Sequence, residues 1–336
     1  MTQKHVYSAS PVFAGLVDYL KMNATTLGGS GYDQGRSGFS LLFFELADFL
    51  NDAALENLAS DLLMQALLTQ TRNISFDKGL SGIGYVLEYL IQNRLVDARF
   101  DELFSAQTEL VVSELERIMK EDLSKCLSQV RTLRFLLGSG NCEYISLAIS
   151  YLNVLQERIN EVFQQILSRD RIYNLDQLAN VWNCLLYIIS LLKDYPIRKD
   201  VLKNYGHLYR SGMFKYDFET RYWFQILGME ERWMETPADL SGRILWEQRM
   251  ADVFLFGLRE HSHFLVIHGH DSLLEGLEQK LLVGDKDKME KELERIVPGK
   301  TKKLSLRNGI PRLVLSLIYM NSEPSVRKRL WPVLMD

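Results

Sequence analysis

A glycine-bearing turn leads directly into a strongly apolar predicted helix in Gly79-Leu-Ser-Gly-Ile-Gly-Tyr-Val-Leu-Glu-Tyr-Leu90. This stretch is the strongest indication of the fold class. A similar phrase lies 44 residues earlier, where Gly35-Arg-Ser-Gly38 opens the helix Phe39-Ser-Leu-Leu-Phe-Phe-Glu-Leu46. Near the end, the turn at Gly309 precedes a third apolar helix, and Pro311 falls in its first turn, where a missing N–H is tolerated. A period in the forties predicts repeated helical hairpins.

Apolar residues recur at helical spacing through most of the chain, and almost no stretch alternates with the period of a strand. The predicted helices are 40–50, 55–68, 85–91, 103–119, 145–167, 178–192 and 312–320. We therefore expect an all-α fold in which six or seven hairpins close an α/α toroid. Its inner helices, such as 41–50 and 184–192, should be buried on most sides. An open helical solenoid is the alternative.

Composition favours one large folded unit, because 47% of the residues are hydrophobic and only seven are proline. We expect a single domain over residues 1–336. The net charge of −4 provides no broad attraction for phosphate backbones, so nucleic acid is not an expected partner. The glycine-rich Gly28-Gly-Ser-Gly31 lacks the ending of a phosphate-binding loop and is interpreted as a flexible entry to the first repeat.

Three scattered cysteines, Cys126, Cys142 and Cys184, match neither a disulfide framework nor a metal-site spacing. The N-terminal residues contain no signal-peptide core, and no run approaches the ~18 apolar residues of a membrane span. These features predict a cytoplasmic protein without a membrane span.

The phrase Ile74–Asn93 resembles an early repeat of the lanthionine synthetase C-like proteins, in which a Gly-Leu-x-Gly-Ile-Gly turn opens an inner helix. Residues Gly35–Leu46 resemble the preceding repeat, and Gly309–Tyr319 is similar to the closing one, so the resemblance covers about residues 30–320. It implies an α/α toroid that holds a zinc ion between two cysteines and a histidine. In that family zinc activates a thiol for addition to a dehydrated serine or threonine of a peptide.

The resemblance also shows what the zinc motifs have lost. The Cys-His-Gly segment is matched by Ile267-His268-Gly269, which keeps only the histidine. At the first cysteine position, in Trp246–Asp252, stands Glu247, and Asn180 replaces a histidine associated with acid–base chemistry. If a metal were bound, a histidine–carboxylate set would suit zinc. The candidate metal ligands are Glu247, His268, and His270 or Asp271. Solvated or core histidines are the plainer interpretation.

Acidic residues near the glycine turns also allow a carbohydrate-active enzyme, because α/α toroids can host paired carboxylates. These residues are Asp33, Asp77 and Glu88, and the sequence marks out no pair among them. Residues before or on a helix are more often caps or solvated positions.

From the loss of zinc ligands we predict a degenerate lanthionine synthetase C-like protein without a cofactor and without confident catalytic residues. It would act as a non-cyclising scaffold or peptide-binding partner in ribosomal peptide modification, binding a peptide or a peptide-modifying enzyme. The alternative is a variant zinc-dependent peptide cyclase, and a third hypothesis is a carbohydrate-active toroid. Residues Gly35, Gly38, Gly79, Gly82 and Gly309 are predicted to form structural turns.

Overall fold

The computed structural model describes residues 11–121, 123–169, 174–192, 195–211, 227, 304–306, 309–320 and 322–334. Its helices are α2 (Pro11–Ala24), α3 (Arg36–Leu50), α4 (Ala53–Leu67), α5 (Leu80–Gln92), α6 (Phe100–Ile118), α7 (Leu123–Ser128), α8 (Thr132–Gly138), α9 (Cys142–Leu167), α10 (Leu175–Ser190), α11 (Lys199–Arg210), α17 (Ile310–Met320) and α18 (Pro324–Leu334). Within those ranges there is no strand, and the predicted all-α class is confirmed. None of the helices there is long and apolar enough to span a membrane.

The chain divides into two compact units, which are described separately. Unit 1 contains residues 1–71, 77–103 and 238–336, and unit 2 contains residues 72–76 and 104–237.

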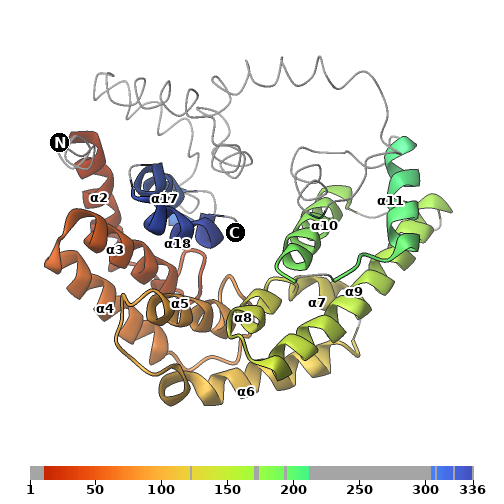
Figure 1. Ribbon diagram of the computed structural model, residues 1–336, viewed down its shortest axis with the longest axis horizontal. Helices are drawn as coiled ribbons and strands as arrows, with labels where there is room; N and C mark the ends of the chain where they lie inside the picture. Colours follow the sequence, from red (N-terminus) through yellow and green to blue (C-terminus); the bar gives the residue numbers. More distant parts are fainter. Residues whose placement is uncertain are drawn as a thin grey trace. The chain divides into compact units, whose positions relative to one another are not determined.

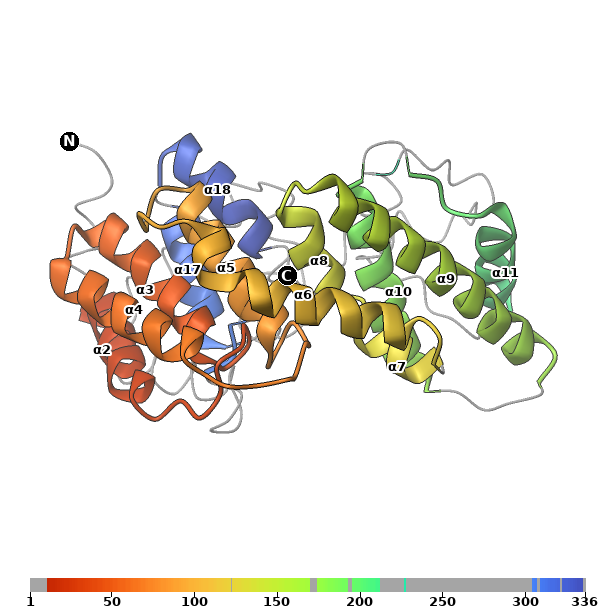
Figure 2. The same cartoon turned by 90° about the horizontal axis from the view of Figure 1, so that it is seen from below.

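In unit 1, helices buried on all sides alternate along the chain with a helix buried on one side. All residues of α3 from Ser37 to Ala47 are buried, and so are all residues of α5 from Leu80 to Leu90. By contrast, α4 buries only a stripe at helical spacing, namely Leu55, Ala59, Leu62, Leu63 and Ala66. Helices α3 and α4 lie side by side, as Figures 1 and 2 show, and α3 also contacts α5. The pair α3–α4 is therefore one hairpin with an inner and an outer helix.

The glycine turns predicted from the sequence begin three helices of unit 1. Gly35 and Gly79 are the N-cap residues of α3 and α5, both with extended backbone. Each glycine carbonyl accepts the first helical bond, from the N–H of Phe39 at 3.1 Å and of Ile83 at 3.3 Å. Gly309 directly precedes α17. Each helix thus starts immediately after its glycine, and the second glycines, Gly38 and Gly82, lie buried in the first turn.

Close backbone contact explains why glycine occupies this region. A Cβ atom on Gly38 would lie 1.9 Å from the carbonyl oxygen of Tyr32, and one on Gly35 would lie 2.2 Å from that of Gly31. A Cβ atom on Gly31 itself would lie 2.5 Å from the backbone of Lys78, in the turn before α5. The interpretation of Gly28–Gly31 as a flexible entry is wrong for Gly31, because its backbone packs directly against the next repeat.

The C-terminal helices of unit 1 pack on its N-terminal helices. Helix α17 contacts α2, α3 and α18, and Figure 1 shows α17 and α18 in blue beside α2 and α3. The hydroxyl of Tyr32 donates to the carbonyl of Val333 at 3.2 Å, and Nη1 of the fully buried Arg312 donates to the same carbonyl at 3.0 Å. The first and last described repeats are therefore neighbours in space.

Unit 2 is built around α9, the long helix that contacts α7, α8 and α11 (Figure 2). Its core includes an aromatic cluster, in which Trp182 of α10 stacks on Tyr205 of α11 with ring centroids 4.9 Å apart. Phe163 of α9 meets Trp182 edge-on at 5.6 Å. Of the stretch 184–192 that was expected to be buried on most sides, Leu185 to Ile189 are buried, whereas Leu191 is 45% exposed.

Candidate functional site

The residues predicted to bind a metal lie outside the described part of the chain. This holds for Glu247, His268, His270 and Asp271. Among the described residues, no group of three or more histidine, cysteine, aspartate or glutamate side chains could hold a metal ion. Asn180, which the resemblance places at an acid–base position, lies on α10.

The three cysteines lie in different surroundings on three helices. Cys126 on α7 is buried, and its thiol donates to the carbonyl of Ile118 at 3.1 Å. The carbonyl of Cys126 accepts a hydrogen bond of 2.9 Å from the hydroxyl of Tyr151, so this residue joins α6, α7 and α9. Cys142 is exposed at the start of α9, and Cys184 is half-buried on α10. Cys126 is therefore a packing residue rather than an available ligand.

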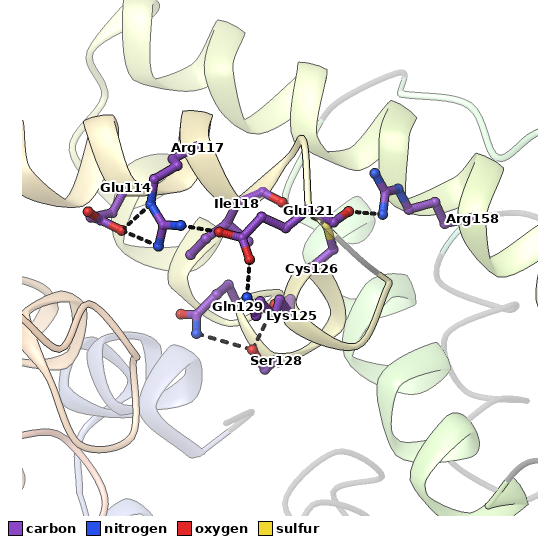
Figure 3. A network of polar contacts seen from close by, with 9 residues as sticks. All are labelled: Glu114, Arg117, Ile118, Glu121, Lys125, Cys126, Ser128, Gln129 and Arg158. Atoms are coloured by element: carbon purple, nitrogen blue, oxygen red, sulfur yellow. Dashed lines mark hydrogen bonds and ion pairs between the residues drawn. The ribbon is translucent and has the colours of Figure 1, made fainter.

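Ionic contacts surround the junction of α6, α7 and α9 in unit 2 (Figure 3). Arg117 and Lys125 both pair with the carboxylate of Glu121. From α9, Arg158 donates to the carbonyl of Glu121, and also to that of Met119 at 3.1 Å, which satisfies backbone acceptors at the end of α6. The side chains of Arg117 and Lys125 are more than half exposed, and exposed ion pairs stabilise by only about 0–1 kcal/mol. This network joins α6, α7 and α9.

In unit 1 a buried polar clamp joins three helices. Nη2 of Arg329 on α18 donates to Oε2 of Glu45 at 2.7 Å and to Oδ2 of Asp48 at 2.6 Å, both on α3. The hydroxyl of Tyr89 on α5 donates to Oε1 of Glu45 at 2.7 Å. Glu45 and Tyr89 stand 44 residues apart, so equivalent positions of two repeats meet directly.

The electrostatic environment of the clamp favours the ion pair between Glu45 and Arg329. Burial raises the pKa of Glu45, while Arg329 opposes that rise. For Arg329, burial acts to lower the pKa, but the charge of Glu45 and the bonds to both carboxylates raise it overall. The pKa of Tyr89 is raised by burial and by the neighbouring Glu45. Both oxygens of the Glu45 carboxylate are occupied, which leaves little capacity for an outside ligand.

A different environment surrounds the face of α5 formed by Tyr85, Glu88, Tyr89 and Gln92. These residues follow the i, i+3, i+4, i+7 spacing and so share one side of the helix. Tyr85, Glu88 and Tyr89 keep 8%, 9% and 6% of their surface exposed, whereas the apolar side chains of Leu80–Leu90 keep 2% or less. The small exposed area of the buried stretch Leu80–Leu90 is therefore concentrated on this α5 face.

Glu88 is the chemically distinctive residue of the α5 face. Its Oε2 atom is buried and has no hydrogen-bond partner among the described residues. Burial raises the pKa of Glu88 to about 7, so the carboxyl group is about half ionised at neutral pH. The sequence-based interpretation of this residue as a cap or solvated position is wrong, because Glu88 lies buried within the helix. Such a group can exchange a proton or bind a cation.

The other two acidic candidates occupy the turns before α3 and α5. The backbone N–H of Asp33 donates to the carbonyl of Asp77 at 2.9 Å, so the two turns lie side by side. Oδ1 of Asp33 accepts a hydrogen bond of 2.7 Å from the hydroxyl of Ser305. The structure thus assigns Asp33 to the contact between the first and last repeats and gives no pairing of its carboxylate with Glu88.

No known protein family, curated protein or solved structure matches the chain.

Proposed function

We propose that this protein is a degenerate lanthionine synthetase C-like α/α toroid, a single domain of six or seven helical hairpins. It acts as a non-cyclising scaffold or peptide-binding partner in the modification of a ribosomally made peptide, in the cytoplasm. The observation that carries the proposal is the pair of glycine turns 44 residues apart, each of which caps a helix buried on all sides. In the lanthionine synthetase C-like proteins that the sequence resembles, a glycine turn likewise opens an inner helix.

The contact between chain ends in unit 1 supports ring closure. Helix α17 follows the third glycine turn and packs on α2 and α3. An open solenoid would place its last repeat far from its first, because each repeat contacts only its neighbours. Contact between the first and last repeats is what a closed ring requires.

The zinc chemistry of the family is not carried over to this chain. In the sequence, the cysteine of the Cys-His-Gly segment is replaced by Ile267, and Glu247 stands at the position of another cysteine ligand. The described cysteines supply no substitute, since Cys126 is buried in packing contacts and lies on a different helix from Cys142 and Cys184. We therefore propose a scaffold that works without a cofactor.

The test uses the purified full chain and a synthetic precursor peptide containing serine, threonine and cysteine, in unmodified and dehydrated forms. Metal content is measured by mass spectrometry for the wild type and for His268→Ala, and peptide binding by fluorescence anisotropy with and without chelator. We expect no stoichiometric zinc, binding that survives both treatments, and no loss of peptide thiols.

Two results would overturn this function in different directions. One zinc per chain that is lost in His268→Ala, with consumption of peptide thiols, would establish the variant zinc-dependent cyclase. Absence of binding to either peptide form would reject the peptide-binding role altogether.

A further inference from the structure

We propose that Glu88, together with Tyr85 and Tyr89 on the α5 face, forms a subsite for a positively charged group, an ammonium or guanidinium, of a bound peptide. The source of the cation rests on the proposed function, whereas the chemistry of the subsite rests on the structure. Oε2 of Glu88 is buried and lacks a hydrogen-bond partner in the described part of the chain.

An unpartnered buried carboxylate is costly, because it loses its hydration without receiving compensating bonds. Burial is the cause that raises the pKa of Glu88. Helices α3 and α4 pack against α5 and carry the charged residues Arg36, Glu45, Asp48, Glu56 and Asp61. None of these charges contributes to that raised pKa. A cation from outside would therefore supply the pairing that the neighbouring helices do not provide.

The two tyrosines on the same face of α5 as Glu88 suit a cation rather than a neutral ligand. Ring faces of tyrosine attract ammonium and guanidinium groups electrostatically. The ring of Tyr85 is held edge-on against Tyr32, with centroids 5.8 Å apart, and Tyr89 is held by its hydrogen bond to Glu45. Because both rings are fixed before binding, little side-chain entropy is lost when a cation enters.

The repeat itself indicates that Glu88 is not demanded by packing. Forty-four residues earlier, the position equivalent to Glu88 holds Phe44, which is 3% exposed on α3. An apolar side chain thus satisfies the same position of the neighbouring hairpin. The carboxylate on α5 is a departure from the repeat that adds charge recognition at a cost in stability.

The test uses small probes, so that it is independent of any precursor peptide. The carboxyl carbon of Glu88 is followed by NMR in the full chain during titration with N-acetyl-lysine methylamide and N-acetyl-arginine methylamide. N-acetyl-norleucine methylamide is the neutral control. We expect both cationic probes, and not the norleucine probe, to lower the pKa of Glu88. The affinity for the cationic probes should fall about tenfold for each pH unit below 7 and should be constant above pH 7, because protonation of the Glu88 carboxylate competes with cation binding.

Two variants complete the experiment. Glu88→Gln keeps the shape of the side chain and should abolish probe binding measured by calorimetry, whereas Glu56→Gln removes an exposed carboxylate of unit 1 and should leave it unchanged. If Glu88→Gln fails to fold, the wild-type NMR titration decides alone.

The subsite is overturned if the Glu88 signal does not respond to about 50 mM of either cationic probe, since a single ion pair with a cation–π contact should reach millimolar affinity. It is also overturned if the norleucine probe has the same effect. Binding of the precursor peptide without any probe response would reject this subsite and leave the proposed function standing. A probe response without precursor binding would support the subsite and reject the proposed peptide-binding function.

Discussion

Replacing Glu88 with glutamine tests the buried carboxylate through the pH dependence of stability. The pKa of Glu88 is about 7 in the folded chain, against an ordinary value of 4.5. Between these two pH values the folded state binds more protons at this residue than the unfolded state. Its contribution to the free energy of unfolding is therefore greatest below pH 4.5 and is lost as the pH rises through 7.

The size of this effect follows from the two pKa values. The difference of about 2.5, at about 1.4 kcal/mol for each pKa unit, gives a loss of about 3 kcal/mol above pH 7. Glu88→Gln stays neutral, so the stability of the variant relative to the wild type should increase by that amount from pH 4.5 to pH 8. Any cost of burying the amide shifts the whole curve equally and leaves its slope unchanged.

The assay is urea denaturation of both proteins at intervals of pH, followed by far-UV circular dichroism. Hydrogen exchange of the α5 amides gives the same quantity locally if the two units unfold separately. Glu56→Gln, on the exposed side of α4, is the control for replacing a carboxylate with an amide. If the difference in stability between Glu88→Gln and the wild type stays constant with pH within about 0.5 kcal/mol, the usual range of surface substitutions, the pKa of Glu88 is not raised in the folded chain.

Two further predictions concern the structure of unit 1. Arg329→Met leaves the buried carboxylate of Glu45 without its cation and should lower the free energy of unfolding by about 3 kcal/mol. Adding Glu45→Gln should recover at least half of that loss in urea denaturation, and equal stability of the single and double variants would contradict the clamp. Gly38→Ala should lower the free energy of unfolding by about 1–3 kcal/mol, because its Cβ would meet the carbonyl oxygen of Tyr32. Gly15→Ala, whose Cβ would have nothing within 4 Å, should raise the free energy of unfolding by about 0.5–1 kcal/mol, so equal changes in the two variants would contradict the close contact.

Much of the helical framework could be predicted from sequence because its signals are local. The repeated glycine turns located the starts of α3 and α5 to within a few residues, and apolar periodicity found α4, α6, α9, α10 and α17. Helix α11 was missed, since its apolar side is reduced to Val201, Tyr205 and Leu208 and the remainder is strongly polar. Helix α2 was not predicted, although its buried residues Phe13, Leu16, Val17 and Leu20 follow a helical spacing.

The polar features of unit 1 were less accessible to sequence reasoning. Arg329 and Glu45 are 284 residues apart, and no local pattern indicates that they pair. Glu88 was visible as an acidic residue in an apolar helix, but one sequence cannot distinguish a solvated side of that helix from a buried one. Only the structure, in which Glu88 keeps 9% of its surface exposed, separates the two cases. The predicted metal ligands stay a prediction, because they lie outside the described residues.

The two buried glutamates of unit 1 show why burial alone does not assign a role. Glu45 is fully buried, and both of its oxygens are bonded, to Arg329 and Tyr89, so its charge is used in holding α3, α5 and α18 together. Glu88 is almost as buried, yet one of its oxygens has no partner in the described chain. Pairing offsets the cost of burying Glu45, whereas the cost of burying Glu88 is not offset within the folded protein. A ligand that carries the complementary charge would offset it, which is why the α5 face is the place to look for recognition.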